Sequence, residues 1–229
     1  MALTAKGSTR NESIYLDIRR NLLRGEFGPG HRFKLSELCA ESGMSVSVVR
    51  EALTRLAEQG LIRSEPHKGF YVPSYTVEQI KDIAFMRAEL ESLAITLSVE
   101  RGAVDWEASV VAAHHELALT PRALLSEDPE ANERWSLAHG AFHRACAAGC
   151  GSPRLIALRQ ALYDEAEILR QMAGLHGRTQ RDVEGEHAGI SQAVIQRDAA
   201  LASRLVKEHI AATAVTSVNA WTAATHGEG

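Results

Sequence analysis

Residues 36–56 contain two short helical patterns that are joined by a glycine turn with almost no residues to spare. The first pattern begins at Ser36, Gly43 makes the turn, and Ser45 is expected to cap a second helix that continues to Leu56. This spacing is typical of a helix-turn-helix, whose second helix enters the major groove of DNA. Two β-prone runs follow, at 60–63 and 68–72, and a turn containing Pro66 separates them. The pattern therefore predicts a winged helix-turn-helix.

The predicted recognition helix and wing supply candidate DNA contacts. Side chains on the first turn and a half of such a helix meet bases and phosphates, and an arginine there can bind guanine or phosphate through two hydrogen bonds. The candidates are Lys34, Ser36, Ser45, Ser47 and Arg50, together with His67, Lys68 and Gly69 in the wing. An ion pair of Arg50 with a neighbouring carboxylate, and solvated turn residues at the wing tip, are the alternatives.

The charge of the chain is divided unevenly along its length. Residues 1–75 carry 11 Lys and Arg against 8 Asp and Glu, whereas residues 76–229 carry 14 against 21. The net charge of −4 therefore combines a basic first part with an acidic remainder. Such asymmetry supports phosphate binding by the first part alone.

The composition indicates a folded chain that belongs in a reducing compartment. Of its 229 residues 45% are hydrophobic, and no apolar run reaches the length of ~20 residues that spans a bilayer. There is no signal-peptide pattern at the N-terminus, and the three cysteines lack a disulfide framework, so we expect a cytoplasmic location and no membrane partner. Cys146 and Cys150 are expected to pack in the core, with metal binding or redox chemistry as the alternative.

The domain organisation follows from a change of pattern near Thr76. Residues 1–75 should form the DNA-binding domain, which begins with an amphipathic helix from Glu12 to Arg24. Its apolar stripe is expected to comprise Ile14, Leu16, Ile18, Leu22 and Leu23. Residues 76–229 contain six helical patterns and no convincing strand, which predicts an all-α bundle and a mostly α fold overall. The helices should start near residues 77, 106, 129, 153, 180 and 199, with expected capping residues Thr76, Asp105, Asp128, Ser152, Thr179 and Asp198.

Histidines are concentrated in the helical part. His139 and His143 are spaced i, i+4, so both project from one face of a helix. His187 and His209 lie one on each of the last two helical patterns, and a bundle can bring all four to one interior point. Imidazoles grouped in this way suit Zn²⁺ or Ni²⁺, although satisfied core histidines remain the alternative from spacing alone.

Arg87 lies on an otherwise apolar helical stripe that runs from Ile80 to Leu97. A buried guanidinium requires an anion. Glu91, one turn further along, is one candidate partner, and the carboxylate of a bound ligand is the other.

These residues resemble the GntR family of bacterial transcription regulators, in the branch with the all-helical FCD (FadR C-terminal) domain, and the six helices resemble its VanR-type subgroup. The resemblance covers about residues 10–222. In the first part it rests on Gly25, Pro29, Gly30, Leu38, Gly43, Ser45, Val49–Leu53, Leu56, Gly60, Leu61, Gly69 and Val72. In the second part it rests on Arg87, Glu91, Phe142, His143, Leu155, His187, Ile190, Ala193, Asp198, Ala202, His209 and Ile210.

The resemblance implies a homodimer that binds a palindromic double-stranded DNA operator and a divalent metal held by one aspartate and three histidines. His143, His187 and His209 match the three histidines, whereas His139 occupies the aspartate position. Zinc is the expected cofactor, with nickel or manganese also possible. The expected effector is a small carboxylate metabolite, bound at the metal and by Arg87 and Arg134. Many family members carry arginine where this chain has Ser36 and Val46, which predicts a different operator.

Together these features predict a metabolite-responsive transcription regulator. We favour a repressor that leaves its operator when the ligand binds. A metal-sensing regulator is one alternative. A metalloenzyme that uses the four histidines is less favoured, because Glu186 should point about 100° away from His187 on an ideal helix and no other general base is evident.

Overall fold

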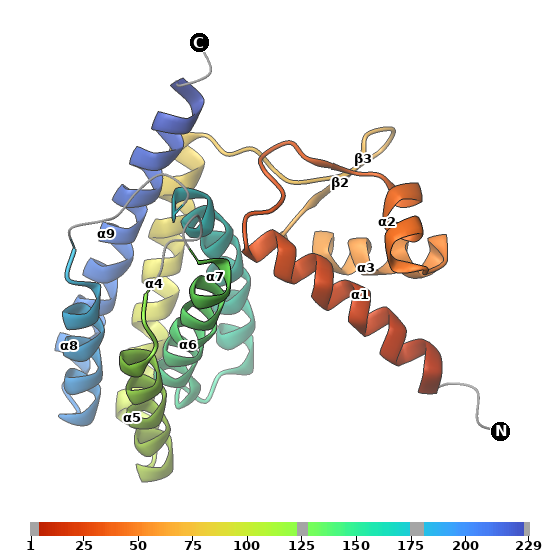
Figure 1. Ribbon diagram of the computed structural model, residues 1–229. Helices are drawn as coiled ribbons and strands as arrows, with labels where there is room; N and C mark the ends of the chain where they lie inside the picture. The colour runs from red at the N-terminus through yellow and green to blue at the C-terminus, as the bar shows by residue number, and fades with distance from the viewer. Residues whose placement is uncertain (1–4, 123–127, 175–180, 227–229) are drawn as a thin grey trace. The chain divides into compact units, whose positions relative to one another are not determined.

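A computed structural model describes residues 5–122, 128–174 and 181–226 (Figure 1). The chain forms two compact units that divide between Thr76 and Val77.

The first unit contains three helices and a small sheet. Its elements are α1 (Ala5–Leu23), β1 (Arg32–Phe33), α2 (Leu35–Ser42), α3 (Val46–Glu58), β2 (Arg63–Glu65) and β3 (Gly69–Tyr71). The strands are antiparallel in the order β1-β3-β2, so β3 is central. The hairpin of β2 and β3 is the predicted wing, whereas the two-residue strand β1 was not predicted.

The core of this unit explains the position of the recognition helix. One face of α3 is completely buried through Val49, Ala52, Leu53 and Leu56, and α1 packs against this helix. The turn before α3 requires Gly43, whose φ of 66° lies in the left-handed region. Burial of one face leaves the opposite face of α3 exposed to solvent.

Two local predictions in this unit were wrong. Ser45 occupies the N-cap position of α3, but its side chain makes no cap hydrogen bond and instead lies 3.0 Å from the hydroxyl of Ser47. Leu16, expected on the apolar stripe of the first helix, is 45% exposed because Tyr15 is turned inward in that part of α1.

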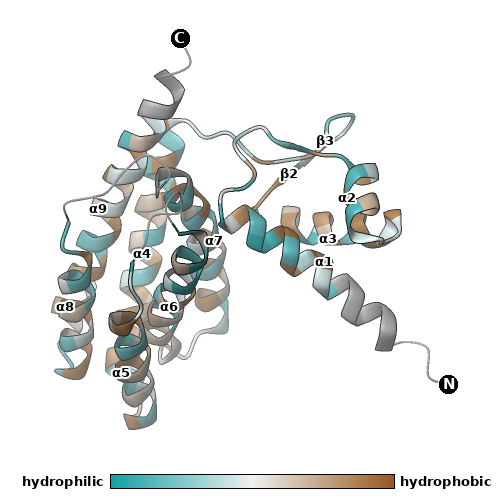
Figure 2. Cartoon of the chain, viewed as in Figure 1, coloured by the Kyte–Doolittle hydropathy of each residue, from teal (hydrophilic) through white to brown (hydrophobic). Residues whose placement is uncertain are grey.

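The second unit is all-α over its described residues. It consists of α4 (Val77–Arg101), α5 (Val104–Leu119), α6 (Pro129–Ala148), α7 (Pro153–Gly174), α8 (Val183–Ile195) and α9 (Ala199–His226). The long helices α4 and α9 lie side by side, and α7 contacts both (Figure 1). Every helix carries hydrophobic and hydrophilic residues together (Figure 2), and none of those described could span a bilayer. The winged helix-turn-helix and the six-helix bundle are thus confirmed.

The helix starts follow local capping chemistry. Asp128 accepts a hydrogen bond from the Ala131 N–H at 2.9 Å, and Asp198 accepts one from Leu201 N–H at the same distance. Ser152 caps α7 in the same way, through the N–H of Leu155 at 3.3 Å. Such bonds satisfy N–H groups that a helix leaves free in its first turn.

Two expected starts differ from the structure. The helix expected to start at Trp106 begins at Val104, so Asp105 lies inside the first turn and not at the cap. The helix expected near residue 180 begins at Val183 behind Asp182, whose side chain accepts from Gly185 N–H at 2.9 Å. The cap expected there, Thr179, lies outside the described residues.

Replacing Asp198 with alanine should lower the free energy of unfolding of the helical unit by about 1 kcal/mol, because the cap of α9 is lost. Asp105→Ala is the matched control and should cost less, since Asp105 does not cap α5. Urea unfolding followed by circular dichroism measures both. Equal losses in the two variants would contradict this assignment of the caps.

Candidate metal centre and nucleic-acid interface

Four histidines from three helices meet inside the second unit. His139 and His143 lie on α6, His187 on α8 and His209 on α9, and each is at most 4% exposed. One potential ligand atom from each ring lies within 4.8 Å of the others. The i, i+4 spacing on α6 places two of the rings next to each other, with centroids 4.6 Å apart.

Hydrogen bonds orient two of these rings. The Nδ1 of His139 lies 3.0 Å from the Tyr163 hydroxyl, and the Nδ1 of His209 lies 2.8 Å from the Glu186 carboxylate. Both contacts leave Nε2 as the atom available for the cluster. The Nε2 atoms of His139 and His143 are 3.2 Å apart, and the buried Nε2 of His187 has no hydrogen-bond partner in the described parts of the chain.

All four imidazoles are held in the neutral form. Burial lowers the pKa of His139 and His143 well below the ordinary value and that of His187 to about 2. Burial also lowers the pKa of His209, although the Glu186 carboxylate opposes the effect. A neutral imidazole keeps a lone pair on one ring nitrogen, which is the form that binds metal ions.

Glu186 has a role that the sequence did not reveal. Its carboxylate does not face His187, as helix geometry indicated, but reaches across to His209 on α9. Arg181 forms an ion pair with the same carboxylate. Burial raises the pKa of Glu186, but hydrogen bonds from His209 and Arg181 outweigh it and lower the pKa to about 2. Glu186 is therefore an ionised group that orients His209.

Trp135 closes one side of the cluster. Its ring stacks on His139 with centroids 4.7 Å apart and an interplanar angle of 15°. The guanidinium of Arg170 lies 5.0 Å from the Trp135 centroid. Tyr163 and Trp135 thus fix the His139 ring between them, and neither residue was expected at the site from the sequence.

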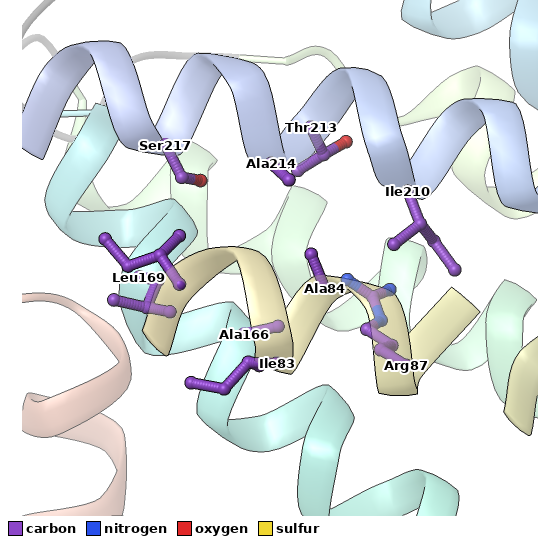
Figure 3. A pocket seen from close by; sticks show the side chains of 10 residues that line it. Ile83, Ala84, Arg87, Ala166, Leu169, Ile210, Thr213, Ala214 and Ser217 are labelled. Carbon is purple, nitrogen blue, oxygen red and sulfur yellow. The ribbon is translucent and has the colours of Figure 1, made fainter. Parts of the chain in front are cut away.

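Arg87 lies at the edge of a cavity of about 20 Å³ between α4, α7 and α9 (Figure 3). The residue is 4% exposed, and its Nε is 3.7 Å from Glu91 Oε1. That distance is too long for a hydrogen bond, and Nε and Nη2 have no hydrogen-bond partner among the described residues. Apolar side chains form most of the cavity wall, with hydroxyls from Thr213 and Ser217.

The structure does not bring Arg134 into this site. Its side chain is 62% exposed and lies 3.8 Å from Glu130 on the same helix. Because Arg134 and His139 are five residues apart on α6, they point in different directions. An effector held by the cluster would therefore not reach Arg134 in this arrangement.

The candidate DNA-binding residues all lie on the surface of the first unit. Among the described residues, no ion pair involves Arg50, so its guanidinium is open to solvent. Lys34 pairs with Glu37 at 2.7 Å and Lys68 with Glu65 at 2.6 Å. The exposed set comprises Lys34, Ser36, Ser45, Ser47, Arg50, His67, Lys68 and Gly69.

Comparison with known proteins assigns each unit to a domain of the same class of bacterial regulators. The model of bacterial regulatory proteins of the gntR family matches residues 10–72, and the FCD domain model matches residues 82–212. The HTH-type transcriptional repressor GlaR of Escherichia coli is 32% identical over 200 residues, which cover 86% of this chain and 90% of GlaR. The regulator BphR of Paraburkholderia xenovorans is 29% identical, over 87% of this chain and 81% of its own.

Solved structures show the same fold. A GntR transcriptional regulator from Rhodococcus sp. RHA1 superposes with a TM-score of 0.72 at 21% identity, over 92% of this chain and 98% of its own. McbR/YncC of E. coli gives 0.71 at 20% identity, over 88% and 93%.

Cys146 and Cys150 belong to the hydrophobic core and not to the histidine cluster. Cys146 and Cys150 are 4% and 0% exposed, and burial raises the pKa of Cys146. Since the thiolate is the reactive form, these two should resist alkylation in the native protein, whereas the partly exposed Cys39 should react. Mass spectrometry after brief iodoacetamide treatment tests this. Modification of Cys146 or Cys150 at the rate of Cys39 would contradict the buried assignment.

Proposed function

We propose that this chain, which belongs to the GntR family of bacterial transcription regulators and carries an FCD domain, is a repressor that a small carboxylate releases from its operator. The carboxylate would bind in the helical unit beside a divalent metal. The observation that carries this proposal is the cluster of four buried, neutral imidazoles. Regulators of this family are not enzymes, and the engagement of Glu186 by His209 and Arg181 agrees with that assignment.

The residues at the cluster fit a metal ion. Four nitrogen donors lie within 4.8 Å of one another, and the buried Nε2 of His187 has no partner within the described ranges, which is unfavourable unless an ion or water satisfies it. His139, His143, His187 and His209 would hold the ion. Four imidazole nitrogens suit Zn²⁺ best and Ni²⁺ well, whereas Mn²⁺ prefers oxygen ligands. When bound, the metal would supply a positive centre that attracts a carboxylate oxygen.

The substitution of histidine for the family aspartate changes the charge of the site. With four neutral ligands the full charge of a divalent cation would remain uncompensated. An uncompensated charge in the protein interior is unfavourable, so the loaded site should favour an anionic ligand. The nearby Arg87 has two buried nitrogens without partners in the part of the chain that the structure describes, which is a second reason to expect an anion.

The incompletely paired guanidinium of Arg87 also favours an organic effector over a metal that acts as the signal by itself. A pure metal sensor has no need for a buried guanidinium with unpaired N–H groups beside the cation. The alternative nevertheless remains testable, because metal alone would then change operator binding.

For DNA binding we propose a dimer that presents two α3 helices to a palindromic operator. A two-fold symmetric protein matches two half-sites related by the same symmetry. Arg50 is the proposed base or phosphate contact, and the wing residues His67, Lys68 and Gly69 would meet the backbone or minor groove. The proposed release requires only that the carboxylate prefer the arrangement with the lower operator affinity. That GlaR is a repressor supports this direction.

Purified protein reconstituted with zinc should contain about one metal ion per chain, and His139→Ala should reduce this content. His115→Ala is the matched control, because His115 is exposed and lies outside the cluster. Elemental mass spectrometry measures both. Unchanged metal content in His139→Ala would contradict a four-histidine site.

The variant His139→Asp restores the family's ligand set and adds a negative charge. It should retain metal and increase the affinity for manganese relative to zinc, since manganese favours oxygen ligands. Competition titrations with both ions measure the ratio. A ratio that is the same in His139→Asp and the parent protein would show that residue 139 is not a ligand.

Substituting Arg50 with alanine should weaken operator binding by about 1–3 kcal/mol through loss of a direct DNA contact. Arg204→Ala, which removes an exposed arginine of α9, is the control and should bind as the parent protein does. Fluorescence anisotropy on a duplex selected from a random pool gives the affinities. Equal weakening in both variants would argue for a general charge effect and against contact by α3.

The proposed function as a whole is tested by adding small carboxylates to the complex of zinc-loaded protein with that duplex. At least one should lower operator affinity by about 5–150-fold, the range of typical coupling free energies. If metal alone produced the change, the protein would be a metal sensor. If no carboxylate had an effect in the presence of metal, the proposed effector class would be wrong.

A further inference from the structure

Two buried arginines share one glutamate beside the histidine cluster. Arg159 on α7 is completely buried, and Arg87 and Glu91 on α4 are 4% and 2% exposed. Both guanidinium groups also lie near the ring of Tyr163, at 4.7 Å for Arg87 and 5.5 Å for Arg159. Tyr163 in turn contacts His139, so this group of charges is continuous with the cluster.

The glutamate is shared unequally. Arg159 Nε donates to Glu91 Oε2 at 2.7 Å, whereas Arg87 Nε lies 3.7 Å from Glu91 Oε1. Burial lowers the pKa of Arg159, but the Glu91 carboxylate outweighs this effect and raises it. Arg159 therefore takes most of the compensating charge that Glu91 provides.

The unequal sharing leaves a buried positive charge without a full partner. Within the described parts of the chain, Glu91 is the only carboxylate paired with either arginine. The atoms without hydrogen-bond partners include Arg87 Nε and Nη2, Arg159 Nη2 and Glu91 Oε1. Such unsatisfied buried charge is costly, and a bound anion would relieve it.

Position separates the roles of the two arginines. Arg87 lines the cavity between α4, α7 and α9 (Figure 3), whereas Arg159 is not among the residues that form its wall. Only Arg87 is thus placed to meet a ligand that enters this cavity. Arg159 instead contacts the other carboxylate oxygen of Glu91, Oε2.

We infer that Arg159 is a positioning residue that neutralises Glu91 and thereby keeps the Arg87 guanidinium available to a ligand carboxylate. The inference rests on the proposed function, in which Arg87 binds the anionic effector. Without Arg159, Glu91 would pair with Arg87, one helical turn away on the same helix, and would occupy the anion site from within the protein. If Arg159 only stabilised the fold, its loss would not change the pairing of Arg87 with Glu91.

Formate is a suitable probe, because it is the smallest carboxylate and the cavity at Arg87 is small. The full-length chain is stripped of metal with a chelator, so that formate cannot bind through a cation. Titration of ¹³C-formate, followed by nuclear magnetic resonance at constant ionic strength, gives the dissociation constant for each variant. Circular dichroism and zinc binding after reconstitution report whether each variant is folded.

Arg159→Met should weaken formate binding by at least about tenfold while zinc still binds, because Glu91 then pairs with Arg87. Glu91→Gln should act in the opposite direction and strengthen formate binding, since it removes the competing carboxylate. Arg134→Met, an exposed arginine on α6, is the matched control and should leave the affinity unchanged.

Arg87→Met separates failure of this inference from failure of the proposed function. Loss of formate binding in Arg87→Met together with unchanged affinity in Arg159→Met would overturn the inference alone. Unchanged affinity in Arg87→Met would overturn the effector role of Arg87 itself. If Arg159→Met does not fold, the Glu91→Gln result decides, and weaker or unchanged formate binding in that variant would overturn the inference.

Discussion

The burial of four imidazole rings at one point governs the chemistry of the helical unit. Burial lowers the pKa of each ring, so the four histidines carry no charge and present lone pairs to a common centre. Helices α6, α8 and α9 must keep their mutual register for the rings to meet, and the contacts of His139 Nδ1 with the Tyr163 hydroxyl and of His209 Nδ1 with the Glu186 carboxylate fix two of them. The geometry of the site therefore depends on the packing of the bundle, because a shift of one helix would separate the ligand atoms.

Charge balance around the cluster points toward an anionic ligand. Glu186 is engaged by Arg181 and His209, and Glu91 is held mainly by Arg159, which leaves Arg87 incompletely paired. A divalent cation on four neutral ligands would add positive charge to this interior. The two features act together, because both the cation and the Arg87 guanidinium would be stabilised by a carboxylate oxygen. In the proposed function, histidine at position 139 in place of the family aspartate would thus alter effector binding as well as the choice of metal.

The sequence predicted the fold well because its strongest signals are local. Capping residues such as Asp128 and Asp198, the turn glycine Gly43 and the apolar periodicity of α3 determine the elements without reference to distant parts of the chain. The pairing of His139 with His143 follows from helical spacing, whereas their meeting with His187 and His209 required the family resemblance. Contacts between side chains of different helices could not be predicted from local sequence patterns. Helical geometry predicted only that Glu186 points away from His187, whereas its partner His209 lies on α9. The contact of Arg159 with Glu91 likewise depends on how α7 packs on α4.

The proposed metal ion would lie at the centre of the four imidazoles. Anomalous diffraction from crystals of the zinc-loaded protein, collected on both sides of the zinc absorption edge, locates the ion without reference to any assumed ligand. We expect one strong peak per chain, within bonding distance of a ring nitrogen from each of His139, His143, His187 and His209. A peak elsewhere, or none at the cluster in fully loaded protein, would contradict it.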